Sequence, residues 1–516
     1  MARECSYNDS HSPIYADTAA LQARIAELEA EVAQKSAAHT VYDSPRLQQV
    51  CGTSSRHTVK NPFGQFPALF FLDYDHFKEA RMTVPSPSPT VPDDIYKLLG
   101  NIDGLRRIAS MFFSNVHTWL PILCRKRFEL MLSNHALVPS ADVALLFSVM
   151  FLLTHEASNC QSNTKTDVYW TVKNFASVLE AHGVMTPQVL QAKVFITLYE
   201  LGHAIYPSAY MSLGSCVTMG KALGIDNRRD TPQLLRRFGA WAELEEIRRL
   251  WWSILLLDRY IHLGFPGHAL ATEDPFRNEV LPADDTQFEQ AEMAGNEPLY
   301  LASPTSLRAG PFTRTCQAAH LVGRTVWALN ELLQELETRF VNAIQLHRTL
   351  TAFVKVVQVD FDAEPERFAT PMALAYSALI ALCDPFSCTE GNRGAHTVEE
   401  TDLQTACIAG IKAVSDDIVR FVQKLRPSMT TRHAAISPLV GYCLYMATIT
   451  FAWRVYEGEE NKLEAYNVIG DTLRLMSGRW AVGSEYLQSV DRGRELLYNT
   501  PLLQPLTCSG PQSFGS

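Results

Sequence analysis

Several stretches of this sequence resemble catalytic or metal-binding motifs, and each lacks one residue that its motif requires. The metalloprotease pattern H-E-x-x-H begins at His155, but Asn159 stands where the second zinc-binding histidine is needed. A run from Gly214 to Lys221 resembles a phosphate-binding loop, but it is one residue too long, and Ala222 replaces the magnesium-binding hydroxyl. Neither pattern can hold its metal ion, so neither predicts an active site.

Adjacent acidic residues at 93–94, 284–285 and 416–417 could bind magnesium if each opened a D-D-x-x-D motif, as in all-α terpenoid synthases. The third acid is absent in every case, and its places are taken by Lys97, Phe288 and Arg420. The histidines share no common spacing, and no G-x-S-x-G nucleophile motif occurs. We therefore expect that the chain is not an enzyme and has no catalytic or cofactor-binding residue.

The composition is that of a globular protein without a dominant charge. Of the 516 residues, 47% are hydrophobic, and the formal net charge of −10 argues against a nucleic-acid footprint along the whole chain. The 11 cysteines include no C-x-x-C pair, and the closest two, Cys383 and Cys388, have no second pair to complete a zinc site. An odd number of cysteines is typical of reduced thiols in an intracellular protein.

The sequence also predicts that no membrane is involved. The N-terminus lacks the apolar segment of a signal peptide. The longest apolar runs, around residues 144–153 and 251–257, are too short to span a bilayer. These features predict a protein of the cytoplasm or nucleus.

The elements that would position any of these residues are helices. From about residue 101, apolar residues recur at helical spacing, stop signals such as Gly183, Gly224 and Pro266 separate the segments, and no strand-type alternation recurs. The predicted fold class is all-α, with a large multi-helix body at 101–500 and a flexible tail at 501–516. Examples of the predicted helices are 141–156, 167–182, 187–204, 209–223, 241–263, 311–338, 340–359, 368–383, 400–425, 437–456 and 462–479.

A short coiled-coil-like helix is predicted in front of this body, at residues 18–35. Its apolar residues fall at a and d positions of about two heptads, whereas a stable coiled coil usually needs three or four. The helix is therefore either a weak dimerisation seam or a lone helix. The seam residues are Leu21, Ile25, Leu28 and Val32.

An irregular linker or arm is predicted for residues 36–100. The alternating prolines of residues 84–92 exclude a helix and a central strand, because each proline removes a hydrogen-bond donor. The same segment is too aromatic for pure disorder, so we expect it to dock on the body as an irregular arm. Its aromatic residues are Phe63, Phe66, Phe70, Phe71, Tyr74 and Phe77.

The most distinctive helix is the charged, tryptophan-rich one around residues 245–260. Apolar residues wrap most of its surface, which predicts burial in a multi-helix body. Glu245 and Arg249 are four residues apart in the favourable order for an ion pair, and Asp258-Arg259 follows the apolar run. We expect a core helix with paired charges at both ends, because an unpaired buried charge is costly.

Three blocks of this body resemble the fungal-specific transcription factor domain, the middle homology region of the fungal binuclear zinc-cluster regulators. The first block, at 113–122, contains His-x-Trp-x-Pro-Ile, and the second runs from 198 to 226. The third is the tryptophan-rich helix, followed by a loop through Pro266 to Pro282. Weaker echoes are Ser437-Pro438 and Arg479-Trp480. The residues that carry the family motif in the third block are Arg248, Arg249, Trp251, Trp252, Asp258 and Arg259.

The sequence departs from the family pattern at its front. Family members carry six cysteines that hold two zinc ions beside a basic stretch that contacts DNA. Here only Cys5 resembles a ligand, the last one, so residues 1–17 are interpreted as a remnant of the module and its linker. Five of the six ligands are absent, and residues 1–40 hold three basic residues against six acids. One thiolate cannot assemble a zinc site, so DNA binding and zinc rest on the resemblance alone.

Two explanations of this departure stay open: an upstream exon missing from the sequence, or a true cluster-less regulator. A second, local departure is Gly264-Phe265-Pro266-Gly267, where the family usually has Gly-Arg-Pro.

The resemblance implies a nuclear regulator of RNA polymerase II transcription, with metabolic or secondary-metabolite gene clusters as candidate targets. The alternative is a cluster-less partner that modulates a full-length zinc-cluster factor without binding DNA itself, and an all-α enzyme is a remote third reading. The implied partners are a homodimeric or heterodimeric zinc-cluster factor and a small-molecule effector in a pocket between helices.

Overall fold

A computed structural model describes residues 66–499 except 86, 134–138, 156–163, 227–233, 235–238, 266, 294–296, 331–335, 388–397 and 432–435. Regular structure in this part of the chain is helical, apart from one isolated antiparallel bridge between Val280 and Tyr300. The prediction of an all-α fold is confirmed. Residues 1–17, the helix at 18–35 with its seam residues, Cys5, Pro266 and the tail at 501–516 lie outside the described residues.

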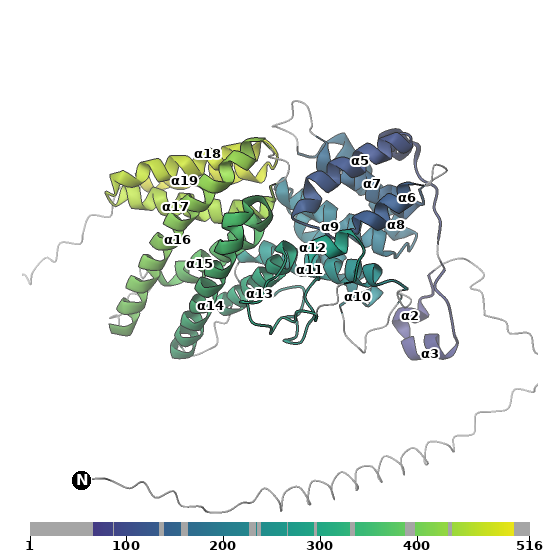
Figure 1. The fold of residues 1–516 in the computed structure, drawn as a ribbon, viewed down its shortest axis with the longest axis horizontal. Helices are drawn as coiled ribbons and strands as arrows, with labels where there is room; N and C mark the ends of the chain where they lie inside the picture. The colour runs from purple at the N-terminus through teal and green to yellow at the C-terminus, as the bar shows by residue number, and fades with distance from the viewer. Residues whose placement is uncertain are drawn as a thin grey trace, which may run out of the picture. The chain divides into compact units, whose positions relative to one another are not determined.

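The helices up to α11 pack around the N-terminal part of the hydrophobic core (Figure 1). Two short helices, α2 and α3, form an arm that precedes the irregular segment at 84–92, and α4 already packs on α7 with Ile95 and Leu99 buried. The bounds are α2 Leu69–Leu72, α3 Tyr74–Glu79, α4 Asp93–Leu99, α5 Ile102–Ser114, η1 Val116–Thr118, α6 Arg125–Leu132, α7 Ala141–Thr154, α8 Asp167–Ala181, α9 Pro187–Gly202, α10 Ser208–Leu223 and α11 Trp241–Leu263.

Among the remaining helices, α15 contacts α13, α14, α16 and α17, whereas α18 and α19 pack on α17 and on each other. Their bounds are α12 Asp285–Glu289, α13 Pro311–Asn330, α14 Leu336–Ala363, α15 Pro365–Ser387, α16 Val398–Thr431, η3 Pro438–Val440, α17 Gly441–Tyr456, η4 Glu460–Lys462, α18 Leu463–Ser477 and α19 Val482–Asn499. Periodicity located most of the predicted helices to within a few residues, but no helix was predicted at α5, α6, α12 or α19, and α2, α3 and α4 lie in the segment at 36–100 that was predicted to be irregular.

Local sequence explains where several helices begin. Thr166 and Thr186 cap α8 and α9 by accepting hydrogen bonds from the backbone N–H groups of Tyr169 and Val189, at 3.1 and 3.3 Å. Pro187 occupies the first turn of α9, where its missing N–H costs nothing. Gly224 ends α10 in the left-handed conformation, with a φ of 75°, as the predicted stop required.

Three helices are buried over most of their length and form the centre of the structure. They are α9 from residue 189 to 202, α11 from 249 to 263, and α15 from 368 to 383. Of the described helices, only α15 is long and apolar enough to cross a bilayer. Because 89% of its apolar window is buried inside the protein, its composition fits a core helix.

Trp480 packs at the junction where the helices up to α11 meet the helices from α12 onward. Trp480 lies against Gly202 at the end of α9, where an added Cβ would be 2.3 Å from the ring. The indole N–H of Trp480 donates to the carbonyl of Ile436 at 2.8 Å, and Tyr260 donates to the carbonyl of Pro438 at 3.4 Å. Blocks that are distant in the sequence therefore meet at one place.

Replacing Gly202 with alanine should destabilise the protein, because the new methyl group forces the Trp480 ring out of its seat. We expect the free energy of unfolding in urea to fall by about 2 kcal/mol. The matched control is Gly214→Ala on α10, where nothing lies within 4 Å of the added Cβ. That change should be neutral or stabilising by up to about 1 kcal/mol. Equal stability of the two variants would contradict this view of the junction.

The same junction should make stability depend on pH. Burial, reinforced by Arg479, lowers the pKa of His203 to about 3, whereas the unfolded value is 6.5. Between these values the unfolded chain binds a proton that the folded chain does not, so stability falls as the pH falls. From pH 7 to pH 5, the wild type should lose about 2 kcal/mol more than His203→Phe in urea unfolding. Parallel losses would show that His203 titrates alike in both states.

Candidate functional site

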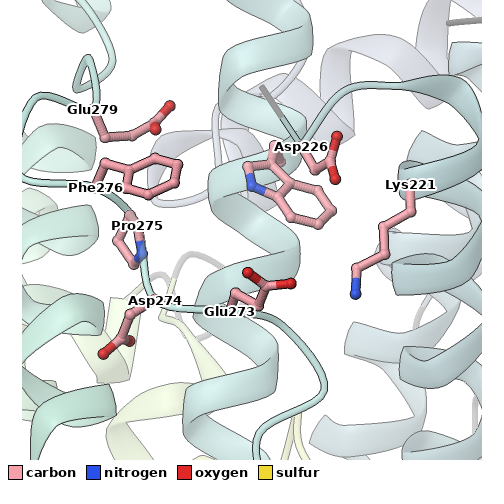
Figure 2. Close-up of a pocket in the computed structure, with 8 residues that line it drawn as sticks. Lys221, Asp226, Glu273, Asp274, Pro275, Phe276 and Glu279 are labelled. Atoms are coloured by element: carbon pink, nitrogen blue, oxygen red, sulfur yellow. The ribbon is translucent and has the colours of Figure 1, made fainter. Parts of the chain in front are cut away.

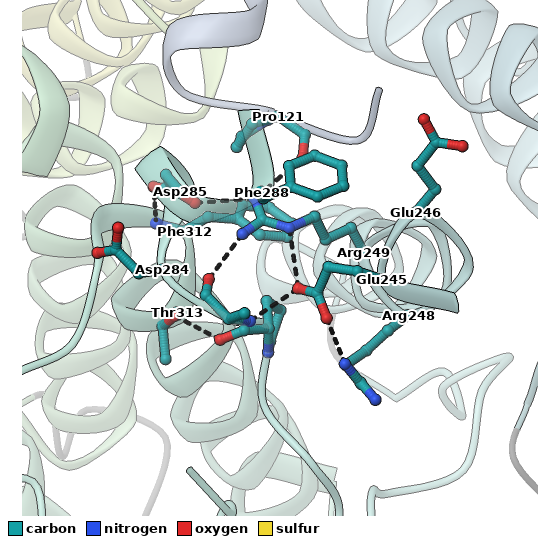
Figure 3. Close-up of polar contacts among 12 residues, drawn as sticks. Pro121, Glu245, Glu246, Arg248, Arg249, Asp284, Asp285, Phe288, Phe312 and Thr313 are labelled. Carbon is teal, nitrogen blue, oxygen red and sulfur yellow. Dashed lines mark hydrogen bonds and ion pairs between the residues drawn. The ribbon is translucent and has the colours of Figure 1, made fainter. Parts of the chain in front are cut away.

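The first half of α11 carries a charge cluster, which we call the Arg249 cluster, formed by Glu245, Arg249 and Asp285 (Figure 3). The guanidinium of Arg249 is fully buried and lies 3.0 Å from a carboxylate oxygen of Glu245 and 2.8 Å from one of Asp285. It also donates to the carbonyls of Pro121 at 3.1 Å and Ala283 at 2.7 Å. One side chain thus joins α11 to the first block and to the loop before α12.

The two carboxylates of this cluster hold backbone as well as charge. Glu245 accepts from the N–H of Ala283 at 2.7 Å and from Arg248, while Asp285 accepts from the N–H of Phe312 at 3.2 Å, at the start of α13. Burial by itself would lower the pKa of Arg249, but Asp285 and Glu245 raise it above its usual value. The opposite charges of the Arg249 cluster therefore stabilise one another in a buried site.

Aromatic rings close the space above the guanidinium. The carbon at the centre of the Arg249 side-chain fork lies 4.0 Å from the ring centroid of Phe288 and 5.3 Å from that of Phe312. Such cation–π contacts are strongest when water is excluded, as it is here. The ring of Phe288 also fills the place where a D-D-x-x-D acid would stand, so packing replaces metal binding at Asp284-Asp285.

The last turns of α11 carry a second charge cluster, the Asp258 cluster, which holds residues 271–274. Asp258 accepts from the backbone N–H groups of Ala271 at 3.1 Å and Thr272 at 2.9 Å. Arg259 lies 2.7 Å from Asp258, and it donates to the carbonyl of Glu273 and to Asp274 at 3.0 and 3.1 Å. This cluster fixes the loop that leaves α11.

In the Asp258 cluster, the buried side chains of Asp258 and His262 stabilise each other's charged forms. Burial would raise the pKa of Asp258, but hydrogen bonds from His262 and Thr272 and the charge of Arg259 bring it below its usual value. Burial would lower the pKa of His262, and the hydrogen bond to Asp258 raises it instead. Gly323 on α13 leaves room for Arg259, because a Cβ there would be 3.0 Å from its Nε.

The other predicted motif residues are packed in the core. Trp252 is buried and donates from its indole to the carbonyl of Val280 at 3.2 Å, while Trp251 packs on Gly220. Arg248, the most exposed of the motif residues, pairs with Glu245. Asp285 and Thr272 were not predicted as partners, since nothing in helical spacing links them to α11. Their only signal was the cost of leaving Arg249 and Asp258 unpaired.

At the first block, His117 is buried beside Glu289, with 3.6 Å between Nε2 and a carboxylate oxygen. Burial lowers the pKa of His117 despite this neighbour. Among the described residues, no group of three or more histidine, cysteine or acidic side chains could hold a metal ion. In the loop that departs from the family pattern, Phe265 stacks on His268 with 3.7 Å between ring centroids.

A small acidic cavity lies between α10, α11 and residues 273–279 (Figure 2). Figure 2 shows Lys221 on one side of it, with Phe276 and Glu279 opposite. Its volume of about 20 Å³ has room for about one water molecule. A ligand larger than water therefore cannot enter without rearrangement.

A larger cavity, of about 660 Å³, lies between the α2–α3 arm and helices α9 and α10, next to one of about 200 Å³. The two share Glu180, Lys193 and Ser215 in their walls. The volume of the larger one is in the range of small-molecule sites.

The described residues form an all-helical domain, and comparison with known proteins identifies its family. Residues 109–316 match the fungal specific transcription factor domain, a stretch that contains all three blocks and both ends of α11. The chain belongs to this family of fungal transcription factors.

Its relatives include transcription factor BOA15 of Botryotinia fuckeliana, 32% identical over 35% of this chain and 98% of the relative. Transcription factor tazR of Aspergillus terreus is 25% identical over 39% of this chain and 33% of the relative. The pigment biosynthesis transcriptional activator pigB of Monascus ruber is 28% identical over 36% and 34%. The chain thus matches nearly all of BOA15 but about a third of tazR and pigB. No solved structure matches.

Replacing Asp258 with alanine should destabilise the domain, because Arg259 and two backbone N–H groups lose a buried partner. We expect a loss of about 3 kcal/mol in the free energy of unfolding. The control is Asp417→Ala, which removes an ion pair with the exposed Arg420 on α16 and should cost less than about 1 kcal/mol. An unchanged thermal midpoint for Asp258→Ala would contradict the structural role of the cluster.

Proposed function

We propose that this protein acts in the nucleus and controls RNA polymerase II transcription of a biosynthetic gene cluster. The observation that carries the proposal is the naming of its relatives. One is a pigment biosynthesis activator, and another, 27% identical over 30% of this chain, is a depudecin biosynthesis cluster-specific activator of Fusarium langsethiae. A transcription factor of this family is not an enzyme, and the geometry agrees with a scaffold role for α11.

The clusters support this role through what their charges do. Each carboxylate of Glu245, Asp258 and Asp285 accepts hydrogen bonds from backbone N–H groups of another segment. A carboxylate engaged in this way holds structure and is poorly placed to exchange protons with a substrate. The charges of α11 therefore support a rigid domain that presents surfaces and cavities to partners.

The test is a deletion of the gene in the source organism, with transcripts measured across the genome. We expect a coordinated change in the transcripts of a contiguous set of biosynthetic genes. The wild-type gene and Gly214→Ala should restore the transcripts, and a tagged copy should accumulate in the nucleus. Unchanged transcripts of every biosynthetic cluster would contradict the proposal.

A second candidate function is modulation of a full-length zinc-cluster factor by pairing with it. The acidic balance of residues 1–40 and the apolar stripe at residues 21, 25, 28 and 32 favour it. In the same strains, the tagged chain would then copurify with such a factor, and its presence on promoters would depend on that factor. Presence on promoters without the factor would favour the first proposal.

A further inference from the structure

The α2–α3 arm carries an aromatic cluster of its own. Phe70 lies at its centre, with ring centroids of Phe66, Phe71, Tyr74 and Phe77 between 5.0 and 5.6 Å away. Phe70 is buried, with 2% of its surface exposed, yet within the described chain these rings do not join the main hydrophobic core. The arm is thus a small packed unit beside the body (Figure 1).

The arm touches the body at one edge and leaves the larger cavity behind it. Phe66 packs against Gly183 in the turn between α8 and α9, where an added Cβ would lie 3.5 Å from the Cβ of Phe66. Beyond this contact, the space of about 660 Å³ separates the rings from α9 and α10. The space is partly open to solvent, and an apolar pocket of this volume between an aromatic arm and two helices suits a small-molecule ligand.

The walls of this cavity specify the kind of molecule that fits. Four aromatic rings of the arm face four aliphatic or thioether side chains of the body. A broad apolar body such as a fused aromatic ring system would be in contact on both sides. The body side chains are Val184, Met185, Val189 and Met219, and two small polar residues, Ser215 and Thr218, lie among them.

The charged residues of the walls add a preference for an anion. Glu180 and Lys193 form an ion pair and cancel each other. Lys221 on α10 also lines the cavity and forms no ion pair with any residue in the described part of the chain. Lys221 also lines the small acidic cavity, so the sum of one net positive charge applies to the side chains that line the larger cavity. A carboxylate, sulfonate or acidic phenol on the ligand would give that ammonium group a partner.

The neighbouring cavity of about 200 Å³ gives the site a polar extension. It reaches Lys173, which lies 2.6 Å from Glu200 and 2.6 Å from the hydroxyl of Ser212. Glu200 is fully buried, and its second carboxylate oxygen has no hydrogen-bond partner in the described residues. Glu200 lies behind this wall, so a ligand with a hydroxyl group at its far end would meet Lys173 and Ser212 past Ser215.

We propose that the cavity between the α2–α3 arm and helices α9 and α10 binds an aromatic, largely apolar small molecule with one negative charge, and that the arm forms one wall of this site. The site does not depend on the proposed control of a gene cluster, since it rests on the walls of the cavity. A ligand held there contacts the arm and the body at once, so binding should also fix the arm against α9 and α10.

The probe is 8-anilinonaphthalene-1-sulfonate, which has aromatic rings and one negative charge, added to the purified full-length protein and followed by fluorescence. We expect saturable binding at one site. Thr218→Trp should weaken it about tenfold or more by filling the cavity, since Thr218 is solvent-accessible there; this factor corresponds to 1.4 kcal/mol. Phe71→Ala should weaken it by removing part of the opposite wall, and Phe71 is 64% exposed, so the fold should persist.

The charge is tested with a neutral probe, N-phenyl-1-naphthylamine, which keeps the rings and lacks the sulfonate. Lys221→Gln should weaken the sulfonate probe about fivefold and leave the neutral probe unchanged. Two controls match the variants. Thr430→Trp changes an exposed threonine on α16 with the same hydroxyl-to-backbone hydrogen bond, and Lys97→Gln removes an exposed lysine of α4.

The thermal midpoint of each variant shows whether it is folded. Absence of saturable binding, or equal binding by folded Thr218→Trp and Thr430→Trp, would overturn the site. Equal binding of both probes, with no effect of Lys221→Gln, would overturn its preference for an anion.

Discussion

The charge on Arg249 is the constraint on which the arrangement of the helices depends. A guanidinium removed from water is stable only when opposite charges and acceptors surround it. Here they come from α11 itself, from Pro121, from Ala283 and from Asp285. None of these segments can move away without leaving a buried charge unpaired, so one side chain determines where the first block, the loop before α12 and the start of α13 lie.

The Asp258 cluster imposes the same constraint at the other end of α11. The loop that follows α11 is bound to this helix at two places. Residues 271–274 bind to the Asp258 cluster, and residues 283–285 bind to the Arg249 cluster. Ion pairs of this kind add less stability than their number suggests, because each charge lost its hydration on burial. Their main effect is on geometry, since few arrangements of the loop satisfy every charge and backbone N–H group.

The sequence predicted the parts of this structure that depend on neighbours along the chain. Apolar spacing located the helices, and the interval between Glu245 and Arg249 indicated their pair. Spacing along the sequence could not predict contacts between residues that are far apart in the chain. The acid pair at 284–285 was judged only as a metal motif, whereas Asp285 is the partner of an arginine 36 residues earlier. Likewise, nothing in the local pattern of Gly202 shows that an indole from residue 480 occupies the space beside it. The aromatic residues of the arm are visible in the sequence, but the cavity behind them depends on where α9 and α10 lie in the fold.

The position of Trp480 against Gly202 bears on the region, residues 109–316, that matches the family. The matched region ends at Cys316, six residues into α13, yet the core that surrounds α9 includes a tryptophan 164 residues further on. The helices from α13 to α19 are therefore part of the same folding unit, although the match does not extend over them. The region that identifies a family can be shorter than the chain needed to fold it. Here the matched region contains the buried charge clusters, whereas folding requires the helices up to α19 as well.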